Sequence, residues 1–585
     1  MLYPKENHCR EMKELNGFWD YKFDWTESGQ KEEWYKVFKK DGQLPVPSSW
    51  NELFADDESK HFLGTCWYQT TTFVPESWQG KNIWIWVGSV SYRAKVWING
   101  KYVGSYEGCH LPFQFTCQQY IKYGQENCIT IAVNAELNKN TIPPGNLNQG
   151  IKGFKTMPKA TNRPDVGFDF FPFGGIHRPV RLYTTSEDYI EDVTVVTDYQ
   201  GKTGKVDITV NISNKKADTL KISVGEYGKT ININNKNALK ATIEIPNVEL
   251  WSTQKPHLYA CNIKLLENEK LLDEYVLSVG VRTVQVKGTQ ILLNGKPIYL
   301  KGFGKHEDFH LIGRGLNHAV IKRDYELMKW IGANSFRTSH YPYSEEMLEY
   351  ADREGFLVIA ETAAVEIRFK YNMDKLLENH KKAIRDLMKR DKNHPSIIMW
   401  SVANEPGSEA KESRKYFKEI MRFAKSFDST RPFTIVSCDG EWIPRGKCNI
   451  MDLCDVICLN RYYAWYAAPA YIKESIQAFS EELDDIYNEY KKPIMLTEFG
   501  ADAVAGLHSM PEMIYSEEFQ AKIIEEKIKI MRSKKFMVGE HIWNFADFLT
   551  GQSAMRVCGN KKGVFTRDRQ PKLAAHVVRQ LWRNK

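Results

Sequence analysis

Residues 397–406 read Ile-Ile-Met-Trp-Ser-Val-Ala-Asn-Glu-Pro, an apolar run that ends in an amide, a carboxylate and a proline. A short apolar run closed in this way is typical of a strand that is buried on both faces. Residues 494–500 repeat the pattern, with Ile-Met-Leu-Thr followed by Glu-Phe-Gly. Each run therefore predicts a buried strand with a glutamate, Glu405 or Glu498, at its carboxyl end.

Similar runs recur through the C-terminal half of the chain, and helical patterns separate most of them. The predicted strands cover residues 298–303, 335–339, 356–360, 397–402, 433–436, 456–459, 494–497 and 537–543. Between two of them, residues 411–425 place Tyr416, Phe417, Ile420, Phe423 and Ala424 on one helical face. Eight strands that alternate with helices over residues 284–585 predict a (β/α)8 TIM barrel, whose chemistry lies at the carboxyl ends of its strands.

The first part of the chain has short strands that alternate apolar and polar residues. One of them, 96–98, runs into Asn99-Gly100, a strong signal for a two-residue hairpin. This pattern predicts a jelly-roll-like β-sandwich over residues 1–185. Residues 137–168 are polar and rich in Pro and Gly, too long for an idle connection, so we expect them to reach a functional surface.

Residues 186–283 contain only strand patterns, spaced about 8 to 15 residues apart. The predicted strands are 193–197, 206–212, 221–224, 241–245, 260–265 and 275–281. Such spacing, without an amphipathic helix, predicts an immunoglobulin-like β-sandwich. The expected organisation is thus two β-sandwiches followed by a barrel.

The composition narrows the classes of partner. The chain has 80 Lys and Arg against 73 Asp and Glu, and this small excess of +7 is not concentrated in runs of like charge. We therefore expect neither nucleic acid nor a membrane surface as partner. We expect no signal peptide, because residues 1–15 are charged throughout, and no apolar run is long enough to span a bilayer. The 11 Cys show no paired spacing and indicate reduced thiols of a cytoplasmic protein. Aromatic residues reach 13%, a content that sugar-binding clefts and sandwich cores both favour.

Glu405 and Glu498 follow the fourth and seventh predicted strands, so both belong to the same rim of the barrel. Two carboxylates that face each other are what glycoside hydrolysis requires, one as nucleophile and one as acid and base. Repulsion between them raises the proton affinity of one partner, which can then act as the acid near neutral pH. We therefore predict a glycosidase with Glu405 and Glu498 as catalytic residues.

Several strings resemble a known family. Residues 334–342, 400–406 and 497–500, behind two sandwiches, resemble glycoside hydrolase family 2. Residues 301–308, 459–463, 543–548 and 559–563 are similar to the bacterial β-glucuronidases of that family. The resemblance covers nearly the whole chain and implies a retaining mechanism, with Glu498 as nucleophile, Glu405 as acid/base and Asn404 on the sugar 2-hydroxyl.

A glucuronide differs from other glycosides by its carboxylate, which a buried site must meet with positive charge and donors. The resemblance implies that Asn560 and Lys562 bind this group, and Arg556 lies four residues before Asn560. It also implies a place in the sugar site for Tyr462, Tyr466 and Asp169. The remaining candidates for binding the sugar or orienting the carboxylates are His306, His340 and Trp543.

Three alternatives stay open. The first is a metal hydrolase, because residues 306–310 read His-Glu-Asp-Phe-His and match the zinc-binding string of metalloproteases. That string binds zinc only on a helix, whereas here it follows a predicted strand that contains two glycines. We therefore expect neither metal nor cofactor. Within the fold, β-galactosidase, β-mannosidase or galacturonidase activity is possible. The third alternative is a carbohydrate-binding protein without catalysis.

The resemblance has one departure and leaves assembly undefined. The segment 362–380 is short, whereas some bacterial β-glucuronidases carry a longer loop here that covers the aglycone. This difference predicts a more open mouth of the barrel. The expected substrates are small-molecule or oligosaccharide glucuronides. A homo-oligomer, a dimer or a tetramer, is expected from the family alone.

Overall fold

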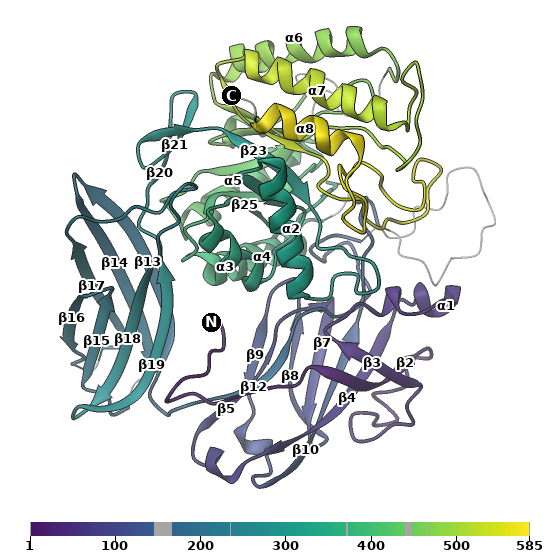
Figure 1. Ribbon diagram of the computed structural model, residues 1–585. Coiled ribbons are helices and arrows are strands. Elements are labelled where there is room, and N and C mark those ends of the chain that lie inside the picture. The colour runs from purple at the N-terminus through teal and green to yellow at the C-terminus, as the bar shows by residue number, and fades with distance from the viewer. Residues whose placement is uncertain are drawn as a thin grey trace.

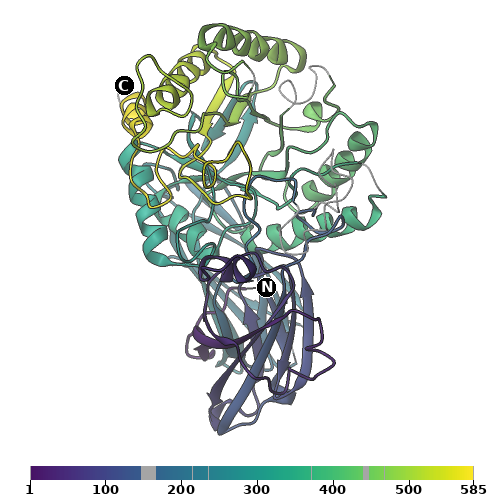
Figure 2. The same ribbon diagram turned by 90° about the vertical axis from the view of Figure 1, so that its right-hand side faces the viewer.

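The computed structural model describes residues 2–145, 166–213, 215–234, 236–369, 372–438, 447–466 and 468–583. It contains two β-sandwiches and a closed barrel of eight parallel strands. In Figure 1 and Figure 2 the barrel rests on one end of the first sandwich. The second sandwich lies to one side of both, at the left of Figure 1. The predicted fold class is therefore confirmed.

The first sandwich consists mainly of two antiparallel sheets. One has the order β1 (Met12–Glu14), β12 (Val180–Thr185), β5 (Asn82–Val87) and β9 (Phe113–Thr116). The other has the order β3 (Gly42–Val46), β2 (Gly17–Asp24), β4 (Thr65–Val74), β10 (Gln125–Asn134), β7 (Arg93–Ile98) and β8 (Lys101–Glu107). Between β7 and β8, Asn99 and Gly100 both have positive φ, as the predicted hairpin requires. Two short strands, β6 (Val90–Ser91) and β11 (Gly175–Ile176), pair with each other, and helix α1 (Asp57–Lys60) lies beyond β3.

The second sandwich pairs a sheet of three strands with a sheet of four. The first contains β13 (Tyr189–Gln200), β14 (Thr203–Ser213) and β17 (Ala238–Ile245). The second has the order β16 (Tyr227–Asn232), β15 (Thr219–Val224), β18 (Tyr259–Glu267) and β19 (Lys270–Val279). All six predicted strands are present, and β16 is an additional edge strand that the sequence analysis missed. Its residues are largely exposed, so it lacks the apolar alternation that reveals a strand.

The barrel follows a small antiparallel sheet of β20 (Val284–Lys287), β21 (Gln290–Leu293) and β22 (Lys296–Ile298). The first predicted barrel strand began two residues too early, because Ile298 ends β22. The barrel strands are β23 (Leu300–Lys305), β24 (Ser335–Thr338), β25 (Leu357–Glu361), β26 (Ile397–Asn404), β27 (Phe433–Ser437), β28 (Ile457–Asn460), β29 (Ile494–Glu498) and β30 (Met537–Ile542).

We propose residues 186 and 284 as the starts of the second and third domains.

In the described part of the chain, an α-helix follows every barrel strand except β27. These helices are α2 (His318–Ile331), α3 (Glu345–Glu354), α4 (Asp374–Asp391), α5 (Lys411–Lys425), α6 (Ile472–Tyr490), α7 (Glu517–Ser533) and α8 (Leu573–Arg583). Helix α5 spans the predicted residues and buries Tyr416, Phe417 and Ile420. Among the described helices, none has the length and apolar character needed to cross a bilayer. None of the eleven cysteines forms a disulfide bond.

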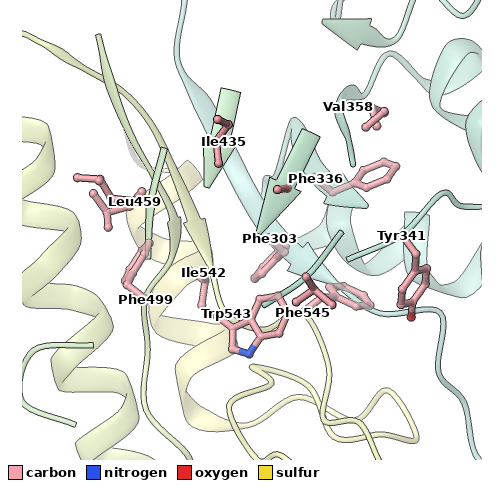
Figure 3. Close-up of a cluster of buried hydrophobic side chains, with 14 of the residues drawn as sticks. Phe303, Phe336, Tyr341, Val358, Ile435, Leu459, Phe499, Ile542, Trp543 and Phe545 are labelled. Atoms are coloured by element: carbon pink, nitrogen blue, oxygen red, sulfur yellow. The ribbon is translucent and has the colours of Figure 1, made fainter. Parts of the chain in front are cut away.

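The inner core of the barrel reaches up to its mouth. Phe303, Phe336 and Ile542 belong to one buried cluster, and Trp543 and Phe545 continue it just beyond β30 (Figure 3). Gly304 allows the indole to pack there, because a Cβ at this position would lie 2.5 Å from Trp543. The core therefore holds one face of the tryptophan rigidly at the carboxyl ends of the strands.

Candidate active site

The two predicted carboxylates lie in one pocket at the carboxyl ends of the barrel strands. Glu405 directly follows β26, and Glu498 is the last residue of β29. Both line a cavity of about 570 Å³, a volume suited to a small organic ligand. Because β27 and β28 separate their strands in the closed barrel, the two side chains approach the cavity from different sides.

Glu498 is surrounded by hydrogen-bond donors. Arg337 on β24 donates from Nη2 to Oε1 at 2.5 Å, and the Tyr462 hydroxyl donates to Oε2 at 2.6 Å. His340 Nε2 lies 3.5 Å from the same Oε1. Arg337 is fully buried, and its Nη1 donates to both oxygens of Glu361 at 2.9 Å. Charge-assisted donors of this kind favour the ionised form of Glu498.

Glu405 has a different environment. Its Oε1 accepts a hydrogen bond from Asn460 Nδ2 at 2.7 Å, and Thr497 Oγ1 donates to Asn460 Oδ1 at 3.0 Å, which orients that amide. Asn404 Oδ1 accepts from Asn460 at 3.2 Å and from Arg337 at 3.3 Å. These contacts use the oxygen of Asn404, so its amide nitrogen can donate to a sugar hydroxyl in the pocket.

The two environments divide the roles of the carboxyl groups. Burial raises the pKa of both carboxyl groups, and at Glu498 the charge of Arg337 opposes this rise. Interacting carboxyl groups titrate as a pair, so near neutral pH the pair retains a proton. Arg337 and Tyr462 contact Glu498, whereas Glu405 receives only the neutral amide of Asn460 among these donors. We therefore place the proton on Glu405 and the charge on Glu498.

A second group of polar side chains lies on the side of the pocket formed after β28, β29 and β30. Lys562 is fully buried, forms an ion pair with Asp502, and donates to the Tyr466 hydroxyl at 2.9 Å. Arg556 Nη2 donates to the same hydroxyl at 2.8 Å, and its Nε donates to Asp169 at 2.8 Å. Burial opposes the charge on Lys562, but Tyr466 and Asp502 outweigh it and raise the pKa of this amine. Two fixed cations thus meet at one phenol oxygen.

Asp169 comes from the first sandwich, and the packing of its two neighbouring residues against the barrel places it beside these cations. Phe168 and Phe170 on either side of it are buried, and the Phe170 ring lies 5.2 Å from the His306 ring. Asn560 Nδ2 donates to Asp169 Oδ2 at 2.8 Å. We call the set the cationic cluster; its members are Asp169, Tyr466, Asp502, Arg556, Asn560 and Lys562. Of the polar stretch 137–168, residues 146–165 lie outside the described residues, and Phe168 lines the pocket.

Two histidines and a tryptophan line the inner part of the pocket. Trp543 stacks on His340, with ring centroids 4.9 Å apart, and His340 Nδ1 lies 2.8 Å from Glu361. His306 Nδ1 contacts the Tyr341 hydroxyl at 3.0 Å, whereas its Nε2 has no hydrogen-bond partner among the described residues. Burial holds the pKa of His306 well below its usual range and lowers that of His340 to about 4, so both rings are neutral at pH 7. His306 Nε2 is therefore a buried polar atom without a protein partner, in a side chain that lines the pocket.

Residues 306–310, which match the zinc-binding string, follow β23 as a loop and not as a helix. His306 is buried and lines the pocket, whereas His310 is exposed. The two rings do not share one helical face, which the zinc-binding arrangement requires.

The structure thus brings all twelve sequence-predicted site residues to one region at the barrel mouth. It also adds residues that the sequence analysis did not single out: Arg337, Glu361, Asn460 and Asp502. A usable signal existed, because Glu361 and Asn460 are the last residues of their strands, Arg337 is the last but one of β24, and Asp502 lies four residues after Glu498. Polar residues at these positions face the mouth of a barrel.

Comparisons with known proteins agree with this geometry. Residues 284–585 match the glycosyl hydrolases family 2 TIM barrel domain, residues 12–186 match the family 2 sugar binding domain, and residues 188–282 match a further glycosyl hydrolases family 2 domain. The chain is 41% identical to a β-glucuronidase of Paenibacillus borealis, over 100% of this chain and 98% of that protein.

Two solved structures are similar over their whole length. The β-D-glucuronidase of Dictyoglomus thermophilum has a TM-score of 0.92 and 38% identity, covering 100% of this chain and 99% of that one. The β-glucuronidase of Ruminococcus gnavus in complex with D-glucaro-d-lactam has a TM-score of 0.92 and 37% identity, covering 99% of both chains. The chain belongs to glycosyl hydrolases family 2.

Proposed function

We propose that this glycoside hydrolase is a retaining β-glucuronidase in which Glu498 is the nucleophile and Glu405 the acid/base. The observation that supports the proposal is the cationic cluster: Arg556 lines the pocket that also holds the two glutamates, and Lys562 lies behind it and donates to the same Tyr466 hydroxyl. A buried ammonium and a guanidinium suit a sugar carboxylate and offer little to an uncharged hexose. The relatives described as β-glucuronidases, one of them with a bound D-glucaro-d-lactam, support the same substrate class.

The reaction has two displacements. In the first, a carboxylate oxygen of Glu498 bonds to the anomeric carbon, the glycosidic bond breaks, and the Glu405 proton passes to the leaving oxygen. In the second, Glu405 takes a proton from water, the water oxygen bonds to the anomeric carbon, and Glu498 is released with its charge restored. Two inversions give β-glucuronic acid, so the configuration is retained.

The other pocket residues have supporting roles in this proposal. The Asn404 amide donates to the sugar 2-hydroxyl, an interaction that strengthens in the transition state. The rings of His306, His340 and Trp543, which line the pocket, orient the sugar over Glu498. Arg337 keeps Glu498 ionised and fixed in position.

Parallel assays test the function. We expect the protein to hydrolyse an aryl β-glucuronide much faster than the aryl galacturonide, galactoside or mannoside, and proton NMR to show the β-anomer of glucuronic acid as the first product. Hydrolysis of the galactoside at an equal rate would contradict the role of the cationic cluster. No release of aryl alcohol at any pH would contradict catalysis itself and favour a carbohydrate-binding protein.

Two further predictions concern the environment of the protein. The eleven cysteines form no disulfide, which is typical of a protein in a reducing compartment and supports the predicted cytoplasmic location. The family resemblance suggests a homo-oligomer, and light scattering of the purified protein distinguishes a dimer or tetramer from a monomer.

A further inference from the structure

A small cavity lies at the contact between the barrel and the first sandwich, which Figure 2 shows from the side. Its volume is about 20 Å³, enough for one water molecule or one ion of similar size. Arg314, from the segment between β23 and α2, and His110, from the segment between β8 and β9, both line it. The rest of the lining is mainly apolar and includes Leu137, Phe170 and Phe173. We call this space the junction cavity.

Arg314 is a buried cation without a counter-ion. Its exposed fraction is 6%, and no carboxylate among the described residues forms an ion pair with it. The acidic residues nearby have other partners, because Glu307 pairs with Arg178 at 3.1 Å and Asp308 with Arg567 at 2.5 Å. An ionised side chain that is buried without a partner is strongly unfavourable. The described chain therefore leaves a positive charge uncompensated at this cavity.

The rings around Arg314 do not compensate its charge. Nη1 lies 3.0 Å from His110 Nδ1 and 3.1 Å from His110 Nε2, and Cζ lies 4.0 Å from the centre of the Tyr341 ring. Burial, and next the charge of Arg314, hold the pKa of His110 well below its usual range, so this ring is neutral. A ring face attracts a cation but brings no negative charge. These contacts orient the guanidinium without neutralising it.

Arg314 also has an unused hydrogen-bond donor. Its Nε is buried and donates to no acceptor among the described residues. Arg282 provides a contrast, because it is also buried and has no carboxylate partner in the described chain. Its Nε and Nη2 donate to the backbone oxygens of Pro395 and Ile397 at 3.0 and 2.9 Å. A buried donor without an acceptor, on a side chain that lines a cavity, indicates an occupant that accepts a hydrogen bond.

We propose that the junction cavity binds one monovalent anion of the size of chloride, with Arg314 as its counter-ion and the Nε–H as a donor to it. A water molecule would accept the same hydrogen bond but would leave the charge of Arg314 unpaired. Phosphate and sulfate carry four oxygens each and are too large for a cavity of about 20 Å³. The ligand is therefore a halide and not an oxyanion.

The anion would be held by both domains, since His110 belongs to the first sandwich and Arg314 to the barrel. The Phe170 ring lies 5.8 Å from Arg314 Cζ and 5.2 Å from the His306 ring, so it separates the junction cavity from the active-site pocket. Binding of the anion should therefore stabilise the docking of the first sandwich and the segment that carries Asp169.

Bromide in crystals of the whole protein gives the most direct test, because bromide can replace chloride and scatters X-rays anomalously. We expect an anomalous peak in the junction cavity within hydrogen-bond distance of Arg314 Nε, and no peak there in Arg314→Met. Bromide at exposed side chains only, with water in the cavity, would overturn the proposal. This test needs the wild type alone, so it holds even if the variant does not fold.

Thermal unfolding tests the site in solution. Chloride replaces methanesulfonate, which is too large for the cavity, at constant ionic strength and pH. We expect a saturable rise in the Tm of the wild type by about 2 °C, the size for a ligand at about 100 times its Kd and a chain of this length. Arg314→Met should show no rise, and Arg353→Met, which removes an exposed arginine of α3, should keep it in full.

A second variant examines the donor itself. Arg314→Lys keeps the positive charge and lacks the Nε–H, so the rise in Tm should need about tenfold more chloride, as for the loss of a hydrogen bond to a charged group. An equal rise in the wild type and Arg314→Met, or no rise in the wild type, would overturn the anion site. An unchanged chloride dependence in Arg314→Lys would overturn the assigned contact. Neither readout uses the catalytic reaction, so these outcomes are independent of the proposed function.

Discussion

The pocket has two sides that differ in how their charges are held. In the cationic cluster, Lys562 is fully buried, and each cation contacts an acidic residue and the Tyr466 hydroxyl. On the opposite side, next to Glu405, the side chains of Glu366 and Arg368 pair with each other and remain partly exposed. A buried charged pair costs several kcal/mol when one partner is removed, whereas an exposed pair contributes about 0 to 1 kcal/mol. The charged residues on the sugar side are therefore fixed in position. Residues on the side of the leaving group can be replaced at little cost to the stability of the fold.

The two sides also differ in origin. The cationic cluster combines segments that follow β28, β29 and β30 with Asp169 of the first sandwich. The side next to Glu405 is lined by Glu366, Arg368, Glu409 and Cys438, which come from segments after three neighbouring strands, β25, β26 and β27. Docking of the first sandwich on the barrel therefore contributes directly to the sugar side. Mutations on the two sides should differ in whether their effects depend on the leaving group.

The largest effect is expected from Glu405→Gln. Without the acid, kcat/KM for a glucuronide with a poor leaving group, such as a sugar or an alkyl alcohol, should fall by about 1000-fold or more. With a strongly activated aryl leaving group the loss should be much smaller, because that group departs without a proton. Steady-state kinetics on a series of glucuronides measures this dependence. A loss of the same size across the series would remove Glu405 from the acid role.

Lys562→Ala should act regardless of the leaving group. Loss of the buried ammonium should lower kcat/KM for all glucuronides by about 100- to 1000-fold, the range for a buried partner of a charged pair. Any activity on an aryl galactoside should fall far less. The matched control is Lys561→Ala, the neighbouring lysine, which lies 4.0 Å from Asp547. Equal losses on glucuronide and galactoside would refute a role of Lys562 in binding the carboxylate.

The pH dependence should separate the two carboxyl groups. Activity requires a protonated Glu405 and an ionised Glu498, so kcat/KM should fall at high pH as Glu405 loses its proton and at low pH as Glu498 gains one. Burial raises the pKa of Glu405, which moves the alkaline limb above the usual range of a carboxyl group. On the activated aryl glucuronide, Glu405→Gln should lose the alkaline limb, a change of about tenfold per pH unit. An unchanged alkaline limb in this variant would assign that proton to another group.

A smaller effect is expected from Tyr466→Phe. This change removes the oxygen at which Arg556 and Lys562 meet and leaves both cations in place. We expect kcat/KM for glucuronides to fall by about tenfold, mostly through KM, because two charge-assisted hydrogen bonds lose their acceptor while a sugar carboxylate can replace it. Tyr471→Phe, at an exposed position, serves as control. A variant with unchanged KM would show that Tyr466 does not organise the sugar side.

Much of the architecture could be predicted because the spacing of apolar residues along the chain indicates strands and helices. The barrel strands β25 to β29 are mainly apolar runs, and α5 has a regular apolar face, so both can be recognised in the sequence. Strand β16 was missed because an exposed edge strand needs no apolar alternation. The position of Glu405 and Glu498 followed from the barrel alone, since strand ends meet at one rim.

The rest of the site depends on contacts that no local pattern contains. Arg337 contacts Glu498 across 161 positions of the chain, and Asp502 meets Lys562 across 60. Asp169 was predicted only through the family resemblance, because its place depends on how Phe168 and Phe170 pack against the barrel. Interactions between distant segments become visible only when the strands are assembled.

The most direct test of the account is to trap the glycosyl-enzyme. A 2-deoxy-2-fluoro-β-glucuronyl fluoride should inactivate the protein with time. The fluorine at carbon 2 slows both displacements, but the activated fluoride leaving group speeds the first, so the glycosyl-enzyme accumulates. Mass spectrometry of a protease digest should then show one added fluoroglucuronyl group on the peptide that contains Glu498, and Glu498→Gln should take up none. A label on another carboxylate, or full turnover by Glu498→Gln, would contradict the proposed mechanism.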